Sequence, residues 1–242
     1  MRNRGAVILE ASIAGQDVVK VPAVGADTAK PAGSFACMPF GATEKLGGQH
    51  GYPRYAPFVI KAETRLNGAT LAATMDQTTE APTMRREIHL GKRSLDIVTH
   101  VTNTTSQRVT TSLAEHPYFP LATGDAGDVL INGRGLDSYF GPDATRDINN
   151  GIARFGLYLG GGLDIALPGL RLVLGARPGK HGLPTESMLG LVAWKRPDGP
   201  NAYTVCFEPT LGVQPCDEGL FNQGLVIPRS ASASLHTTIA LA

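Results

Sequence analysis

The sequence predicts an all-β protein built mainly from antiparallel sheets, on three observations. Apolar and polar residues alternate with period two in several segments, and no window carries a sustained helical period with caps. The 29 glycines and 17 prolines are spread along the chain, as expected for many turns between short strands. Because all-β folds commonly reach 242 residues as one unit, we expect a single domain over residues 1–242.

The alternation locates the expected strands. Residues 95–102 form a half-buried strand, and the polar residues 103–106 form a turn. Residues 109–116 form the next strand, so we expect a hairpin between the two. Further strands are expected at residues 170–174, 203–208 and 234–241.

Composition narrows the class of protein. Hydrophobic residues make up 42% of the chain, enough for a real core, and the formal charge is only +1. A strong field for nucleic acid or an anionic membrane is therefore not expected. No apolar run reaches the roughly 18 residues of a membrane span, and Glu10 interrupts the first apolar stretch, which argues against a signal peptide. We expect a cytoplasmic protein.

The three cysteines, Cys37, Cys206 and Cys216, are an odd number without a spaced framework, which argues against a disulfide-stapled domain. Pairing of Cys206 with Cys216 stays open. Histidines and cysteines show no metal-ligand spacing along the chain, and glycine-rich phosphate motifs are absent. We therefore expect neither a metal nor an organic cofactor.

Three segments place polar groups in constrained surroundings: residues 49–54 (QHGYPR), 116–121 (HPYFPL) and 205–210 (VCFEPT). Glu208 stands among apolar neighbours near a strand end, so desolvation should raise its pKa and make it a better base near neutral pH. His116 closes a strand and can give or take a proton at physiological pH. Taken alone, a histidine at a strand end is more often a structural residue, and a glutamate before a proline is more often a solvent-facing strand end. A base and an acid on opposite sides of a polar substrate would catalyse reversible proton transfer.

Together, and in this order, these segments resemble the aldose 1-epimerase family (galactose mutarotase-like proteins). The matching elements are residues 38–41 (MPFG), 50–54 (HGYPR), 116–119 (HPYF) and 206–209 (CFEP), and they span most of the chain from Met38 onward. The resemblance implies a β-supersandwich of large antiparallel sheets with a sugar-binding cleft. It also implies interconversion of the α and β anomers of a free aldose, without a cofactor. We expect a monomer or a homodimer.

The resemblance further implies roles for individual residues. Glu208 would take the proton of the anomeric hydroxyl, His116 would protonate the ring oxygen, and His50 would hold the ring oxygen or a neighbouring hydroxyl. The sugar-binding Asp of the family matches Asp164 in residues 162–167 (GLDIAL), with Asp137 as the competitor. Either Asp could equally serve as a turn residue.

Residues 42–45 (ATEK) replace the Asn-Arg pair that family members usually carry after the Pro-Phe segment. Lys45 could substitute, although an ammonium lacks the planar fork of a guanidinium. Arg54 could supply a cationic sugar contact, or it could pair with a carboxylate at the rim of the core.

Because these departures affect the sugar contacts, they leave the substrate less defined. A hexose 6-phosphate epimerase and a non-catalytic carbohydrate-binding protein on the same fold are the alternatives to an epimerase of free aldoses.

We expect the basic cluster Arg85, Arg86, Lys92 and Arg93 to form a solvated face.

Overall fold

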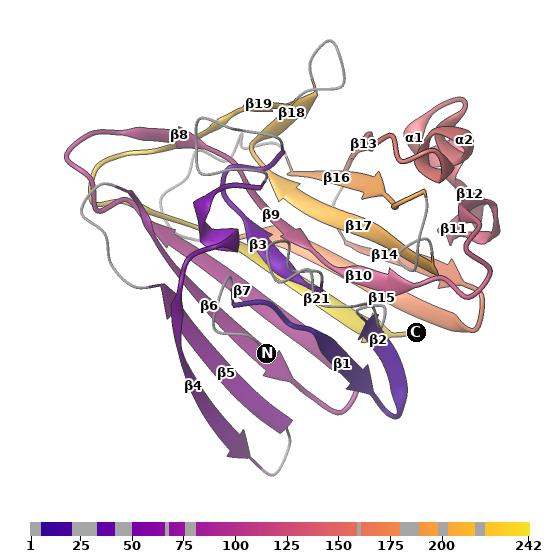
Figure 1. The fold of residues 1–242 in the computed structure, drawn as a ribbon, viewed down its shortest axis with the longest axis horizontal. Coiled ribbons are helices and arrows are strands. Elements are labelled where there is room, and N and C mark those ends of the chain that lie inside the picture. The colour runs from indigo at the N-terminus through magenta and orange to yellow at the C-terminus, as the bar shows by residue number, and fades with distance from the viewer. Residues whose placement is uncertain are drawn as a thin grey trace.

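Two large antiparallel sheets face each other and enclose the core (Figure 1). The computed structural model of the protein describes residues 6–20, 33–41, 50–65, 68–75, 81–158, 161–179, 189–197, 203–215 and 221–242. Within these residues, β-strands predominate. The all-β, antiparallel fold class expected from the alternation is confirmed.

The smaller of the two sheets has six strands and carries the candidate site. In spatial order it runs through β13 (Arg154–Leu157), β16 (Leu189–Trp194), β17 (Thr204–Leu211), β9 (Leu113–His116) and β3 (Phe35–Cys37), with β10 (Tyr118–Pro120) also pairing with β17.

The larger sheet has nine strands. In spatial order these are β12 (Arg134–Gly135), β11 (Leu130–Ile131), β14 (Gly162–Leu167), β15 (Leu170–Pro178), β21 (Ser232–Leu241), β7 (Ser94–Thr102), β6 (Thr83–Leu90), β5 (Gly68–Met75) and β4 (Phe58–Arg65).

Short elements complete the described part of the chain. The remaining strands form the pairs β1 (Glu10–Ile13) with β2 (Gln16–Lys20), β18 (Val213–Pro215) with β19 (Phe221–Gln223), and β8 (Val109–Thr111) with β20 (Leu225–Ile227). The helical elements are α1 (Leu136–Phe140), α2 (Ala144–Asn149) and the 3₁₀ turns η2 (Tyr52–Arg54) and η3 (Ala126–Asp128). None of the described helices is long and apolar enough to cross a membrane.

The core lies between the two large sheets. Phe119 and Phe207 of the six-stranded sheet pack in one cluster with Ile97 of the nine-stranded sheet. Alternate residues of a strand point to opposite faces, so a strand buried on one side only should alternate between buried and exposed residues. All eight residues of β17 are nonetheless buried. The six-stranded sheet is therefore covered on its outer face as well as on its core face.

The strand predictions at residues 95–102, 170–174, 203–208 and 234–241 are confirmed by β7, β15, β17 and β21. The hairpin predicted between residues 95–102 and 109–116 is wrong. β7 pairs with β6 and β21, whereas β8 pairs with β20. Residues 109–116 also divide at Ser112 into β8 and β9, which enter different sheets. Alternation predicts a strand, but it does not select the partner of that strand.

The expectation that Arg86 belongs to a solvated basic face is also wrong. Arg86 occupies an inward position of β6, between the buried Met84 and Ile88, and it is fully buried. Its Nη2 lies 2.5 Å from Oε1 of the buried Glu115 on β9, and its Nη1 donates to the carbonyl of Ala6. This ion pair crosses the core and joins the two large sheets. By contrast, Arg85, the preceding residue on β6, is exposed.

Candidate active site

The candidate site lies on the outer face of the six-stranded sheet, where β17 meets the junction of β9 and β10. Ala114 of β9 pairs with Thr210 of β17, and Tyr118 of β10 pairs with Cys206. Following the same antiparallel register places His116 opposite Glu208. Because residues two apart on a strand share a face, Cys206 and Glu208 project to the same side as His116.

His116 and Glu208 are in contact and almost completely buried. His116 Nε2 lies 3.4 Å from Glu208 Oε1, and the two side chains are 3% and 2% exposed. His116 Nδ1 and Glu208 Oε2 are buried without a hydrogen-bond partner in the described residues. Buried polar atoms without partners cost stability, so they commonly indicate a functional group or a site for a ligand.

Burial favours the neutral form of both partners. It raises the pKa of the Glu208 carboxyl well above its usual range, with the Arg54 guanidinium opposing that shift. It also lowers the pKa of His116 well below its usual range, and the neighbouring His50 and Arg54 add to this effect. The desolvation of Glu208 predicted from its apolar neighbours is thus confirmed. Both pKa shifts thus favour an uncharged carboxyl group and an uncharged imidazole in the buried site.

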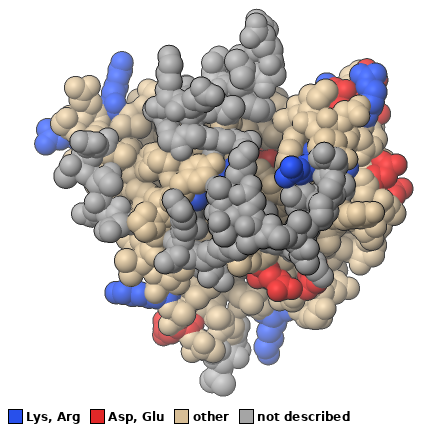
Figure 2. Space-filling view, in the orientation of Figure 1, with Lys and Arg blue, Asp and Glu red and all other residues tan. Residues whose placement is uncertain are grey.

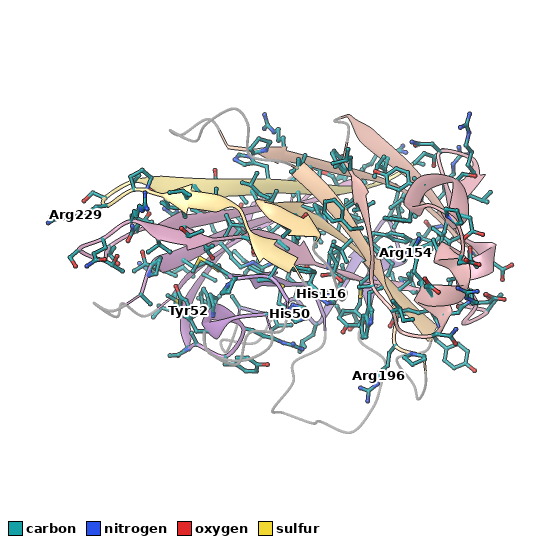
Figure 3. All side chains as sticks on the ribbon, turned by 90° about the horizontal axis from the view of Figure 1, so that it is seen from above. His50, Tyr52, His116, Arg154, Arg196 and Arg229 are labelled. Atoms are coloured by element: carbon teal, nitrogen blue, oxygen red, sulfur yellow. The ribbon has the colours of Figure 1, made fainter. Side chains whose placement is uncertain are left out.

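His50 lies beside His116, with 5.0 Å between the ring centroids (Figure 3). The His50 backbone adopts a left-handed conformation, with φ of 65°, and forms a turn with Gly51. The backbone N–H of His50 donates to the carbonyl of Gly41, and the carbonyl of His50 accepts from the N–H of Met38. These bonds fix the His50 backbone against the residues that follow β3.

Gly51 is required for this turn, because its φ is +77° and a Cβ there would lie 2.0 Å from the carbonyl oxygen of Met38. We expect Gly51→Ala to destabilise the protein by more than the ~1–2 kcal/mol that a left-handed alanine costs. Gly133→Ala is the matched control, since Gly133 has φ of +75° and a Cβ added there would meet no atom within 4 Å. Urea unfolding of both variants measures the difference. Equal destabilisation would contradict the close approach at Met38.

Burial lowers the pKa of His50 to about 3, and the nearby Arg54 contributes. A histidine with a depressed folded-state pKa stabilises the fold above its ordinary pKa of 6.5, and this stability is lost as the pH falls toward 3. His116 acts in the same direction. The raised pKa of Glu208 acts in the opposite direction, because the folded carboxyl binds protons more readily than the unfolded one in this range. With two histidines against one carboxyl, we expect the free energy of unfolding to fall by a few kcal/mol between about pH 7 and pH 4.

Urea unfolding across this pH range checks the expectation. His50→Gln should flatten the profile, because the substituted side chain does not titrate. His89→Gln, at an exposed position of β6, should leave it unchanged. A parent protein as stable at the acidic end as at neutral pH would contradict the burial of neutral histidines.

Aromatic rings hold His116 in place. Phe35 of β3 stacks on the imidazole at 4.6 Å between centroids, and Tyr118 stacks on it at 5.1 Å. The Arg54 guanidinium lies over the Phe35 ring, with Cζ 4.4 Å from the centroid, and Arg54 is only 5% exposed. Arg54 thus belongs to the same buried cluster, and its positive charge acts on the pKa of His50, His116 and Glu208.

The structure brings together four of the six residues selected from the sequence: His50, Arg54, His116 and Glu208. Asp164 does not join them. It lies on β14 of the nine-stranded sheet, where its inward neighbours Leu163 and Ile165 are buried. The Asp164 carboxylate therefore faces outward, and it accepts two hydrogen bonds from Arg171.

The competitor Asp137 is exposed in the first turn of α1, where it accepts a hydrogen bond from the Thr145 N–H. Among the described residues, no contact links either Asp to His116 or Glu208. Lys45 lies outside the described residues, as does Cys216.

Sequence reasoning missed Cys206, Phe35 and Trp194 as members of the site. Trp194 contacts the His116 ring edge-on at 6.3 Å. Cys206 is a free, buried thiol, and its Sγ lies within 4.8 Å of a ligand atom of both His116 and Glu208. These three side chains could together hold a metal ion. His116 lies on β9, far along the chain from Cys206 and Glu208 on β17, so spacing along the sequence could not reveal the set.

Comparison with known proteins identifies the fold. No family model matches the sequence, and no curated protein matches it. Several solved structures do resemble it in three dimensions. A galactose mutarotase-like protein from Clostridium acetobutylicum superposes with a TM-score of 0.69 at 13% identity, covering 99% of this chain and 90% of the other.

A galactose mutarotase related enzyme from Lactobacillus acidophilus gives a TM-score of 0.69 at 14% identity, covering 100% and 93% of the two chains. A provisionally named aldose 1-epimerase from Escherichia coli K12 gives 0.67 at 12% identity, covering 99% and 94%. The chain has the galactose mutarotase-like fold. At these identities the likeness establishes the fold alone.

Proposed function

We propose that the protein is an isomerase that interconverts the α and β anomers of a free aldose. The observation that carries this proposal is the buried pair of His116 and Glu208, in contact at 3.4 Å, with one atom of each side chain lacking a hydrogen-bond partner. Sugar hydroxyls both donate and accept hydrogen bonds, so a sugar beside the pair can satisfy such atoms.

The proposed reaction needs one base and one acid. Glu208 removes the proton of the anomeric hydroxyl while His116 protonates the ring oxygen, and the bond between the anomeric carbon and the ring oxygen breaks. The resulting aldehyde rotates about its bond to the next carbon. Ring closure on the other face reverses both proton transfers, so the two residues exchange roles and return to their starting states. His50 and Arg54 hold the sugar oxygens.

Ring opening requires Glu208 as a carboxylate and His116 as an imidazolium, whereas burial shifts the pKa of each group toward its neutral form. Moving one proton from Glu208 to His116 converts the neutral pair into this reactive state. The proton can pass across the contact between the two side chains without exchange with water. Hydrogen bonds from sugar hydroxyls to the charged forms favour this redistribution.

Two further observations support a free aldose rather than a sugar phosphate. Arg86 lies in the core. The exposed Arg85 is paired with Glu87, with 3.0 Å between Nη2 and Oε1, and both lie on β6 of the nine-stranded sheet, away from the candidate site. Described basic and acidic side chains are interspersed around the periphery in Figure 2, so on that face they form no patch of one sign. A phosphate would require several cationic groups beside the sugar.

Polarimetry tests the proposal. Freshly dissolved α-anomers of a panel of free aldoses should equilibrate faster with the protein than without it, and a hexose 6-phosphate should respond less. Preference for the phosphate would favour the 6-phosphate epimerase. Sugar binding in calorimetry without faster equilibration of any sugar would indicate a carbohydrate-binding protein and contradict the proposal.

A further inference from the structure

The outer face of β17 also offers a set of metal ligands within the candidate active site. His116, Cys206 and Glu208 each offer one ligand atom, and these atoms all lie within 4.8 Å of one another. Imidazole, thiolate and carboxylate are the three side-chain ligands of protein-bound zinc, and open zinc sites use three protein ligands. We propose that these three residues form a binding site for a divalent ion of the zinc class.

The geometry requires little rearrangement. In a tetrahedral zinc site, the usual Zn–N and Zn–O bond lengths and the tetrahedral angle place a nitrogen ligand and an oxygen ligand about 3.4 Å apart. The observed distance from His116 Nε2 to Glu208 Oε1 is 3.4 Å. The Cys206 sulfur has to approach by about 1 Å at most to complete the set. Cys206 and Glu208 project from one face of β17, so both approach the ion from one rigid strand.

The charges also balance. A thiolate and a carboxylate neutralise the two positive charges of the ion, so the complex buries no net charge. Glu208 Oε2 is buried without a hydrogen-bond partner, so one carboxylate oxygen has unused acceptor capacity. The thiolate favours zinc or cobalt over magnesium and calcium, which prefer oxygen ligands alone.

Cobalt titration of the full-length protein, free of any histidine tag, tests the site. Co²⁺ should bind with 1:1 stoichiometry and give the intense thiolate-to-metal absorption and visible bands of a tetrahedral complex. Zn²⁺ should abolish both. Cys206→Ser should remove the thiolate absorption and weaken binding at least about tenfold, and Glu208→Gln should weaken binding similarly.

Cys37→Ser is the matched control, because Cys37 is a buried thiol in the same outer cluster but outside the three-residue set. Cys216→Ser provides the same control for the remaining cysteine. Both should keep the absorption. Thiolate absorption that persists in Cys206→Ser, or no cobalt binding by the parent protein, would overturn the site. Circular dichroism verifies that each variant is folded.

The proposed metal site shares His116 and Glu208 with the proposed catalytic pair, but the cobalt titration that tests it requires no sugar. A metal on His116 and Glu208 would occupy both acid and base, so Zn²⁺ should slow anomer interconversion in the parent protein. Cobalt binding through Cys206 by a protein that accelerates no sugar would support the metal site and contradict the proposed function. Catalysis without cobalt binding would do the reverse.

Discussion

Glu208→Gln is expected to reduce the rate of anomer interconversion by at least about 100-fold, because general acid–base groups contribute about 10²–10⁴-fold. Glutamine has nearly the same shape as glutamic acid, but it cannot hold the proton of the pair or accept one from the sugar. Polarimetric rates at saturating sugar measure kcat. The KM should change less than kcat, since hydrogen bonds to the amide can replace some of those to the carboxyl group.

Glu87→Gln provides the control. Glu87 lies on the outward side of β6 and pairs with Arg85, so its loss should leave the rate unchanged. Unfolding midpoints establish that both variants are folded. Because burial raises the pKa of the Glu208 carboxyl well above its usual range and so disfavours its charged form, Glu208→Gln should be no less stable than the parent protein. A folded Glu208→Gln variant that equilibrates sugars at the parental rate would exclude Glu208 as the base.

The second large effect concerns the buried ion pair of Arg86 and Glu115. Replacing Glu115 alone by leucine is expected to destabilise the protein by about 3–5 kcal/mol, because a fully buried guanidinium then lacks its counter-charge. Arg86→Met should have a similar effect, since it leaves a buried carboxylate that also accepts from the hydroxyl of Ser34. Urea unfolding at pH 7 measures both.

The double variant Arg86→Met with Glu115→Leu should recover most of that loss, because replacing both charges by apolar groups removes the desolvation penalty. Arg85→Met is the control, since its ion pair is exposed and should contribute no more than about 1 kcal/mol. Single variants within about 1 kcal/mol of the parent would contradict the role assigned to this pair.

This ion pair also affects the site, because Glu115 and His116 are neighbours on β9 and point to opposite faces of the six-stranded sheet. Ala36 and Phe35 of β3 pair with Glu115 and His116, respectively. The network thus fixes β9 from the core side while Phe35 stacks on His116 from the outer side. We expect a Glu115 variant that remains folded to lose activity as well as stability.

Much of the fold follows from local patterns in the sequence. The strands β7 and β21 have regular alternation, and their inward residues, such as Leu95 and Ile239, are buried. Partner choice is not local, so the predicted hairpin was wrong. The helices α1 and α2 have five and six residues, too few for a helical period to be detected. Arg86 is buried through a partner on a distant strand, which charge patterning cannot predict.

The site was partly predictable for the same reason. His50, Arg54, His116 and Glu208 stand in constrained segments whose order resembles a known family, and the fold places them in one buried cluster. Asp164 resembles the family segment because apolar residues follow it, but that pattern is simply the alternation of β14. A cysteine between apolar residues has no distinguishing local signal, so the sequence does not single out Cys206.

We propose that the buried outer face of the six-stranded sheet catalyses anomer interconversion. The most direct measurement is exchange NMR on a free aldose at anomeric equilibrium, where exchange between the α and β anomeric protons reports turnover without net reaction. We expect the parent protein to produce exchange peaks that Glu208→Gln and His116→Gln do not. Exchange no faster than in buffer for every aldose tested, by a folded parent protein, would contradict it.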